Sequence, residues 1–112
     1  TYGHNAGDEV LRHVAGYLRR NVRICDGVYR WGGEEFIVIL PDTGDEEAAE
    51  AAERVRQAIM GSVCHFEGMD IKVTMSFGVT QLDPMKSIED NIKTADEKLY
   101  KAKESGRNTV IL

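Results

Sequence analysis

The amino-acid sequence predicts one α/β domain, and three observations support this fold class. Three segments repeat apolar residues at helical spacing, near residues 8–20, 43–60 and 87–105. Two runs rich in aromatic and β-branched residues flank a pair of glycines, which is typical of a hairpin. Residues 71–79 alternate between apolar and polar or small side chains, as a half-buried strand does. The 112 residues suffice for a single domain with one core.

The first predicted helix follows a turn at Gly7, with Asp8 as its N-cap, and ends near Arg20 or Asn21. Its apolar side chains share one face, because they recur three or four residues apart. They are Val10, Leu11, Val14, Ala15 and Leu18.

A hairpin is expected next, with strands over residues 28–31 and 35–40 and a tight turn at Gly32 and Gly33. The second strand is a continuous apolar run, which suits a strand buried on both faces and therefore central in its sheet. Two carboxylates, Glu34 and Glu35, stand directly against the turn. A glycine turn beside acidic residues lets a ligand approach the backbone and supplies oxygen ligands for a divalent cation.

The remaining elements are predicted from their end signals. Thr43, with Glu46 three residues later, forms a capping box for a helix that runs to about Met60. Residues 61–70 are a loop or a weak strand, and 71–79 are the clearest strand. Ser87 begins the third helix, and Gly106 follows its end. Residues 109–112 are a last short strand.

The predicted order is therefore α-β-β-α-β-α-β. A strand before the first helix would complete a βαββαβ pattern, the ferredoxin-like arrangement, in which that first strand lies in the middle of the sheet. The 112 residues would then lack the central strand, which would leave two buried strand edges without a partner.

Composition narrows the possible partners and compartment. The net charge of −5 argues against broad attraction to nucleic acid or anionic lipid, so no nucleic-acid partner is expected. No run approaches the ~20 apolar residues of a membrane span. Cys25 and Cys64 lack metal-site or redox spacing and are interpreted as free thiols in a reducing compartment. We expect a cytoplasmic protein, or the cytoplasmic part of a larger multidomain or membrane-bound one, with membrane contact only through absent N-terminal modules.

Four segments resemble the GGDEF domain in order and spacing. Residues 32–36 match its signature in the GGEEF form, and residues 2–8 match its YGHxxGD segment. Residues 73–79 resemble its VTxSxGV strand, and residues 95–108 resemble its ADxALYxAKxxGRN ending. The resemblance implies a nucleotidyl-cyclase-like fold over residues 1–112. It also implies a diguanylate cyclase, which condenses two GTP into cyclic di-GMP and pyrophosphate with Mg²⁺ or Mn²⁺, as a homodimer whose subunits each hold one GTP.

By this resemblance Glu34 is a metal-binding acid, and Glu35 binds metal or deprotonates the ribose 3′-hydroxyl. Gly32 and Gly33 would let the turn backbone lie against the nucleotide. The alternative is that both glutamates are solvated charges at a hairpin tip.

The resemblance also assigns substrate-binding residues. Asp8 would read guanine, whose N1 and N2 donors a carboxylate can accept, and it could still cap the helix. Lys103 and Arg107 would hold the GTP phosphates, although two cations near a helix C-terminus are also favourable without a ligand.

Arg23 and Asp26 form an RxxD pattern that matches the family's product-inhibition site, with Arg54 as a further contact. The alternative is a local salt bridge in a turn, which contributes little.

The largest departure from the family is at the start of the chain. The family begins with a strand whose aspartate binds both metals, followed by an asparagine that reads guanine, and neither is present. We expect a piece of a longer protein, or a second chain or swapped segment in the gap, and no turnover by these residues alone. A non-catalytic module that senses cyclic di-GMP or GTP, or a dimerisation domain, is the alternative function.

Overall fold

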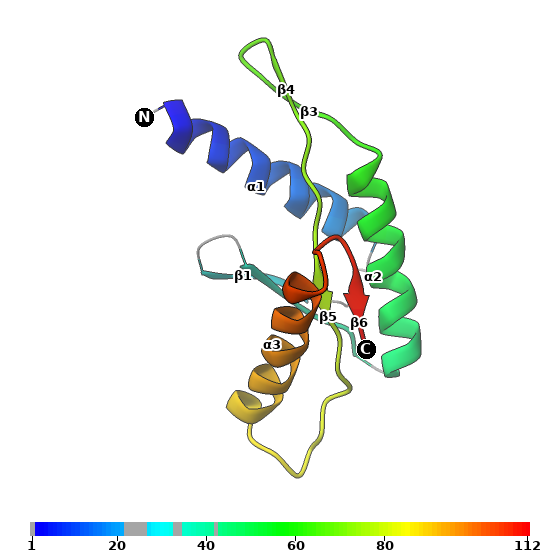
Figure 1. The fold of residues 1–112 in the computed structure, drawn as a ribbon. Coiled ribbons are helices and arrows are strands. Elements are labelled where there is room, and N and C mark those ends of the chain that lie inside the picture. The colour runs from blue at the N-terminus through cyan, green and yellow to red at the C-terminus, as the bar shows by residue number, and fades with distance from the viewer. Residues whose placement is uncertain (1, 22–26, 33–34, 42) are drawn as a thin grey trace.

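The computed structural model describes residues 2–21, 27–32, 35–41 and 43–112 (Figure 1). Its helices and strands follow the predicted order, with one additional hairpin between the second helix and the strand at 77–78. In order they are α1 (Tyr2–Arg20), β1 (Gly27–Gly32), β2 (Glu35–Ile39), α2 (Asp45–Met60), β3 (Cys64–Phe66), β4 (Met69–Ile71), β5 (Phe77–Gly78), α3 (Ile88–Glu104) and β6 (Val110–Ile111).

Helix α1 begins earlier than predicted, at Tyr2, so Asp8 lies within the helix and is not its N-cap. The prediction was wrong because it gave too much weight to Gly7. A glycine inside a helix costs only about 1 kcal/mol relative to alanine and does not end the helix, whereas proline, absent from this segment, would. The predicted end is confirmed at Arg20, after which the Asn21 side chain donates to the Tyr17 carbonyl oxygen at 2.8 Å.

Strands β1 and β2 form the predicted antiparallel hairpin, with one difference at the turn. Gly32 is paired opposite Glu35, so Gly32 belongs to the strand and is not a turn residue. Within the described residues β2 pairs only with β1, whereas its apolar run predicted a central strand. The side of β2 away from β1 borders a groove described below.

Helix α2 has Gly44 as its N-cap and no side-chain hydrogen bond at that cap, so the predicted capping box is wrong. The Thr43 hydroxyl instead donates to the Pro41 carbonyl oxygen at 3.0 Å. The predicted end at Met60 is confirmed.

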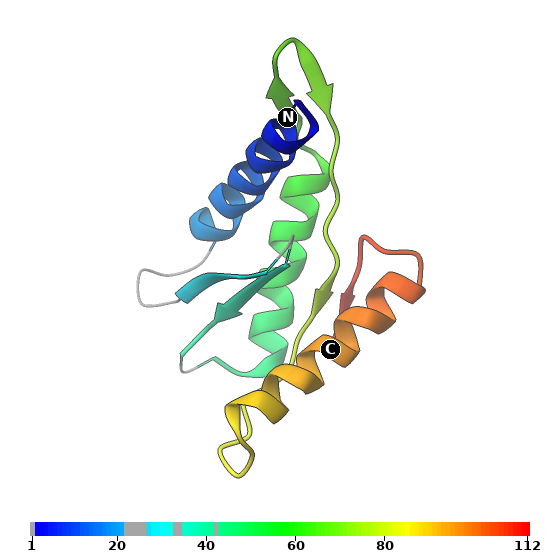
Figure 2. The same cartoon turned by 90° about the vertical axis from the view of Figure 1, so that its left-hand side faces the viewer.

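The segment at 61–70, expected as a loop or weak strand, forms most of a short hairpin that ends at Ile71. Strands β3 and β4 pair around Glu67 and Gly68, which both have positive φ (48° and 80°), as the tightest hairpin turns require. Figure 2 shows this hairpin projecting beyond α1. The Cys64 thiol is buried there, and burial raises its pKa.

The stretch predicted as the clearest strand keeps its alternation but is paired only in part. Val73, Met75, Phe77 and Val79 are at least half buried, whereas Lys72 and Thr74 are exposed. Regular pairing is limited to β5, which runs parallel to β6. Two ladder bonds define the pair, from Phe77 N to Thr109 O and from Val79 N to Ile111 O, both 2.9 Å.

Helix α3 connects β5 to β6 and has both predicted ends. The Ser87 side chain accepts from Asp90 N at 3.1 Å. Gly106 has φ +105°, and the Arg107 amide donates to the Ala102 carbonyl oxygen at 3.0 Å, which together form a Schellman-type end.

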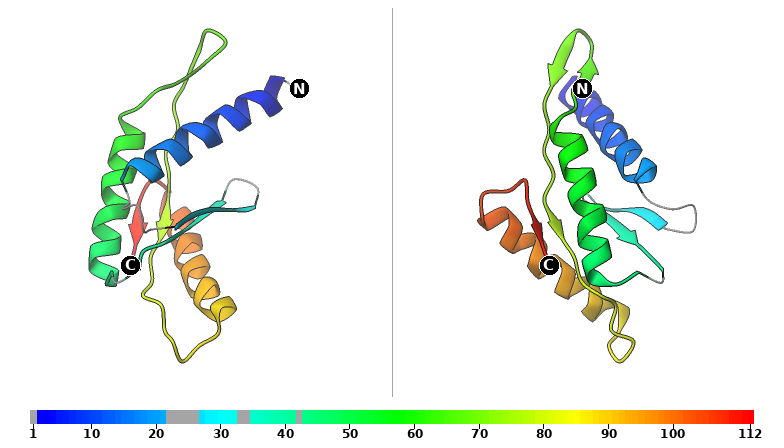
Figure 3. Two further views of the ribbon diagram at one scale, coloured as in Figure 1. Left: turned by 180° about the vertical axis from the view of Figure 1, so that it is seen from behind. Right: turned by 90° about the vertical axis from the view of Figure 1, so that its right-hand side faces the viewer.

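The core lies where α1 crosses α2. Val14 and Leu18 of α1 pack against Val55 and Ile59 of α2, and all four are buried. Strands β5 and β6 lie between α2 and α3 (Figure 3). The described chain measures 49 × 27 × 23 Å, an elongated outline that follows from the projecting hairpin and the open groove.

Candidate active site

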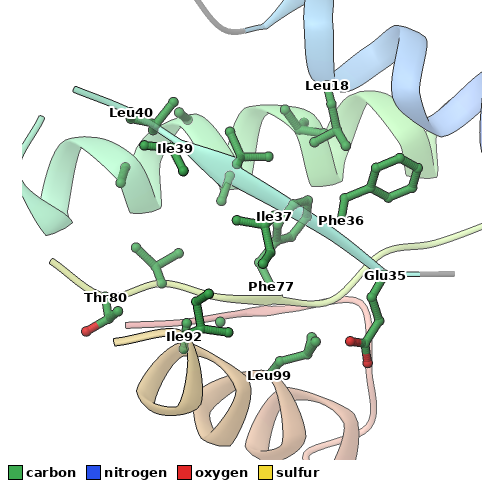
Figure 4. Close-up of a pocket in the computed structure, with 18 of the residues that line it drawn as sticks. Leu18, Glu35, Phe36, Ile37, Ile39, Leu40, Phe77, Thr80, Ile92 and Leu99 are labelled. Atoms are coloured by element: carbon green, nitrogen blue, oxygen red, sulfur yellow. The ribbon is translucent and has the colours of Figure 1, made fainter. Parts of the chain in front are cut away.

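A groove of about 1080 Å³ separates β2 from β5, and we call it the β2–β5 groove (Figure 4). One wall is β2 with Leu40, and the other is the extended segment 74–82. The apolar faces of α2 and α3 line it as well, from Ala48 to Val55 and from Ile88 to Leu99. Ile37, Phe77, Ile92 and Leu99 lie around its middle in Figure 4. The groove therefore runs between two strands that are each hydrogen-bonded on one side only within the described chain.

Three charged residues that the sequence singled out line this groove together: Glu35, Lys103 and Arg107. The Lys103 Nζ lies 3.7 Å from Glu35 Oε1, and the two side chains are 38% and 41% exposed. Figure 4 shows the Glu35 side chain leaving β2 toward the last turns of α3. An ion pair this exposed adds little stability, because water screens it. Its two partners therefore remain available to a ligand.

The end of α3 explains why both cations face the groove. Lys103 is four residues after Leu99, so it continues the helix face that lines the groove. The chain then reverses at Gly106, and the Schellman-type end turns Arg107 back beside the helix. A side chain with a point charge and one with a planar fork thus line the groove together with the Glu35 carboxylate, and two such cations suit a polyphosphate.

Asp8 lies elsewhere. It is half-buried on α1 and lines a smaller recess with Arg12, Arg19, Val28 and Phe36. Only Phe36 is shared between this recess and the β2–β5 groove. The structure therefore does not bring Asp8 into one pocket with Glu35 and Lys103.

Four of the predicted site residues lie outside the described residues: Gly33, Glu34, Arg23 and Asp26. Arg54 is exposed on α2 and does not line the groove.

Glu35 is the one predicted metal ligand that the structure describes. Its carboxylate is the hard oxygen donor that Mg²⁺ and Mn²⁺ prefer, so it fits a magnesium site as one ligand of several. Among the described residues, no group of three or more His, Cys, Asp or Glu side chains is placed to hold a metal ion.

The sequence reasoning missed a polar cluster beside the site. Arg56 of α2 binds the Glu53 carboxylate with two hydrogen bonds and also reaches Asn108, immediately after Arg107. The Glu53–Arg56 spacing is a helical i, i+3 pair and could have indicated the first contact. Nothing in the local pattern indicates the contact with Asn108, which is 52 residues away.

In the part of the chain that the structure describes, none of the helices combines the length and apolar character needed to span a membrane.

Residues 1–109 match the family described as "Diguanylate cyclase, GGDEF domain". The chain is 42% identical over 107 residues to the diguanylate cyclase DgcP of Pseudomonas aeruginosa, covering 96% of this chain and 16% of that protein. It is 47% identical over 115 residues to the response regulator PleD of Caulobacter vibrioides, covering 99% of this chain and 25% of PleD.

A solved structure agrees with these relatives. The GGDEF domain of DgcB from Caulobacter crescentus, in complex with c-di-GMP, superposes with a TM-score of 0.91 at 32% identity. That match covers 99% of this chain and 67% of the DgcB chain. The fold and the grooved site thus define a nucleotide-cyclase-like α/β domain, and the predicted fold class is confirmed. The chain belongs to the GGDEF family, and it spans a quarter or less of the two relatives in length.

Proposed function

We propose that this chain is most of a diguanylate cyclase domain, which condenses two GTP molecules into cyclic di-GMP and pyrophosphate. One observation carries the proposal beyond family membership. Glu35 of β2, Lys103 of α3 and Arg107 just after α3 line the same groove. An acidic chain that takes a triphosphate needs such a local pair of cations.

In the proposed reaction the 3′-oxygen of one GTP attacks the α-phosphorus of the other. The bond from that phosphorus to the pyrophosphate leaving group breaks, and a second round closes the ring. Lys103 and Arg107 bind the leaving phosphates, and Glu35 helps to hold a metal ion or accepts the 3′-hydroxyl proton. A bound Mg²⁺ or Mn²⁺ would neutralise triphosphate charge and favour deprotonation of the hydroxyl.

The remaining assignments follow the family. Glu34 would be a further metal ligand, Gly32 and Gly33 would lie against the nucleotide, and Asp8 would read guanine from its own recess. Each subunit of a homodimer would hold one GTP. Arg23, Asp26 and Arg54 would bind cyclic di-GMP as an inhibitor.

We also propose that an extended strand occupies the β2–β5 groove in the working domain. β2 and β5 each leave one edge toward the groove, and unpaired backbone groups beside buried apolar walls are unfavourable. Ile39, Leu82 and Ile88 line the groove and are 52%, 61% and 66% exposed. A strand from a segment outside these 112 residues would cover them, and it would be the element to supply a further metal-binding carboxylate.

The test uses a protein that includes that strand, incubated with GTP and Mg²⁺ and assayed for cyclic di-GMP by chromatography. Glu35→Gln should lower the rate by about 10²–10⁴-fold, the usual contribution of a positioned acid or base. Glu104→Gln is the control, because Glu104 is an exposed acid at the end of α3 outside the groove. A Glu35→Gln protein that keeps its rate would contradict the proposal.

Two further outcomes decide between alternatives. Binding of cyclic di-GMP that is lost in Arg23→Ala, without any synthesis, would indicate a sensor module. The 112 residues alone should make no product, and measurable synthesis by them would contradict the proposed strand.

A further inference from the structure

The turn that carries Arg107 has an unfavourable backbone conformation. After α3, Gly106 has φ +105°, Arg107 has φ +64° and Asn108 has φ +48°. Only glycine adopts such angles freely. Each other residue there costs of order 1 kcal/mol or more, although asparagine tolerates them better than most. Two such residues in succession persist only where their surroundings hold them.

Two contacts from distant elements hold this turn. The Asn108 amide donates to the Ser76 hydroxyl at 3.0 Å. Arg56 Nη1 donates to the Asn108 side-chain oxygen at 3.1 Å and to its carbonyl oxygen at 3.4 Å. Hydrogen bonds therefore hold the backbone N–H, the carbonyl oxygen and the side-chain oxygen of Asn108.

Arg56 is itself rigidly held. Its Nε and Nη2 donate to the two Glu53 oxygens at 2.5 and 2.6 Å, a bidentate geometry. Its side chain is only 15% exposed. Because Glu53 already neutralises this guanidinium, Arg56 is poorly suited to bind an anion itself. Its Nη1, which does not contact Glu53, instead joins α2 to the turn through Asn108.

The 106–108 turn connects the Arg56–Asn108 hydrogen bonds to the candidate active site. Arg107 and Ser76 both line the β2–β5 groove, and Lys103 stands one helical turn before Arg107. Rotation of the backbone at 107–108 would move the Arg107 fork relative to Lys103 and Glu35.

We propose that Arg56 is a positioning residue: its hydrogen bonds to Asn108 hold the 106–108 turn so that Arg107 meets the phosphates of GTP. This inference rests on the proposed function, because it assigns Arg107 that ligand. Arg56 acts through Arg107 and touches no substrate.

The experiment measures KM for GTP, kcat and melting temperature in the strand-containing protein. Arg56→Ala should raise KM on the order of ten- to a hundredfold, the scale of misplacing a binding group. Arg56→Lys should behave similarly, because an ammonium keeps the charge but cannot bind Glu53 with two donors and Asn108 at once. Lys93→Ala, which removes an exposed cation from α3, should change neither constant.

A double-mutant cycle separates positioning from loss of folded protein. In an Arg107→Ala background, Arg56→Ala should raise KM no further. A purely structural role would lower the melting temperature and the active fraction while leaving KM unchanged, which would overturn the proposal. A wild-type KM in Arg56→Lys would overturn the proposal as well. So would additive effects of Arg56→Ala and Arg107→Ala on KM in the double-mutant cycle.

The wild-type protein tests the proposed function separately. If it binds GTP but makes no product, GTP affinity by calorimetry replaces KM, and the same comparisons decide the role of Arg56. If it neither binds GTP nor turns it over, both the proposed function and this inference fail. If wild type is active and Arg56→Ala matches it, only the inference fails.

Discussion

The ammonium of Lys103 lies 3.7 Å from the carboxylate of Glu35, although the two residues belong to the last turn of α3 and the first residue of β2. Both were expected in the same site from separate sequence segments. Their contact joins those segments in the β2–β5 groove, which Arg107 also lines. A bound triphosphate would compete with Glu35 for Lys103.

Lys103→Gln should therefore weaken substrate binding with little loss of stability. In the strand-containing protein we expect KM for GTP to rise by on the order of tenfold or more, since a hydrogen bond to a charged group contributes about 1.5–3 kcal/mol. The melting temperature should hardly change, because the ion pair with Glu35 is exposed. Steady-state kinetics and a thermal melt check both parts. Lys101→Gln, an exposed lysine of the same turn, serves as the control, and an equal KM for the two variants would contradict the assignment.

Gly78→Ala should destabilise the fold. A Cβ at this position would fall inside the contact distance of the Ala95 carbonyl oxygen and the Leu99 amide nitrogen of α3. Backbone atoms of a helix cannot yield as a flexible side chain can, so α3 would have to move away from β5. We expect a loss of about 1–3 kcal/mol in the free energy of unfolding, the usual range for overpacking. Urea denaturation measures it.

Gly7→Ala is the matched control for that substitution. A Cβ on Gly7 meets nothing within 4 Å, and the residue is exposed within α1. Alanine there should stabilise the protein by roughly 0.5–1 kcal/mol. A stable Gly78→Ala protein would show that α3 and β5 do not pack as closely as described.

Substitutions at Ile59 test how tightly the core between α1 and α2 is packed. Its side chain is fully buried, at 0% exposure, beside Val55, Val14 and Leu18. Ile59→Ala should cost about 2–5 kcal/mol and Ile59→Val about 0.5–1.5 kcal/mol, because the larger deletion leaves the larger cavity. Chemical denaturation gives both values. Equally small losses of unfolding free energy in the two variants would mean that the surrounding core closes over the cavity or that Ile59 is not buried.

The Glu53 carboxyl group should have an unusually low pKa. The hydrogen bonds from Arg56, aided by Gln57, lower the pKa of Glu53 from 4.5 to about 2, although partial burial opposes the shift. Because the pKa is lower in the folded state, this carboxylate stabilises the fold above about pH 4.5 and loses that contribution as the pH falls toward 2. Carbon-13 NMR of the Glu53 carboxyl measures the titration directly.

Two variants check the cause of that shift. Arg56→Ala should return the Glu53 pKa toward 4.5, since it removes the main donor. Glu53→Gln should remove this part of the pH dependence of stability. An unchanged Glu53 titration in Arg56→Ala would show that another group lowers the pKa.

The sequence alone allowed most local elements and the charged residues of the groove to be predicted. Helical periodicity places the C-terminal end of α1, and serine and glycine signals mark the start and end of α3, because these signals depend on neighbours in the chain. The hairpin at β1–β2 and the charged residues Glu35, Lys103 and Arg107 were also visible in the sequence.

The tertiary structure decided which of those residues meet. It places Asp8 inside α1 and in a separate recess, and it sets Lys103 against Glu35. It also joins Arg56 to Asn108 across 52 residues. The physical reason is that such contacts depend on how α2, α3 and the strands pack. Packing brings together side chains that share no local pattern, and it leaves β2 and β5 facing one groove.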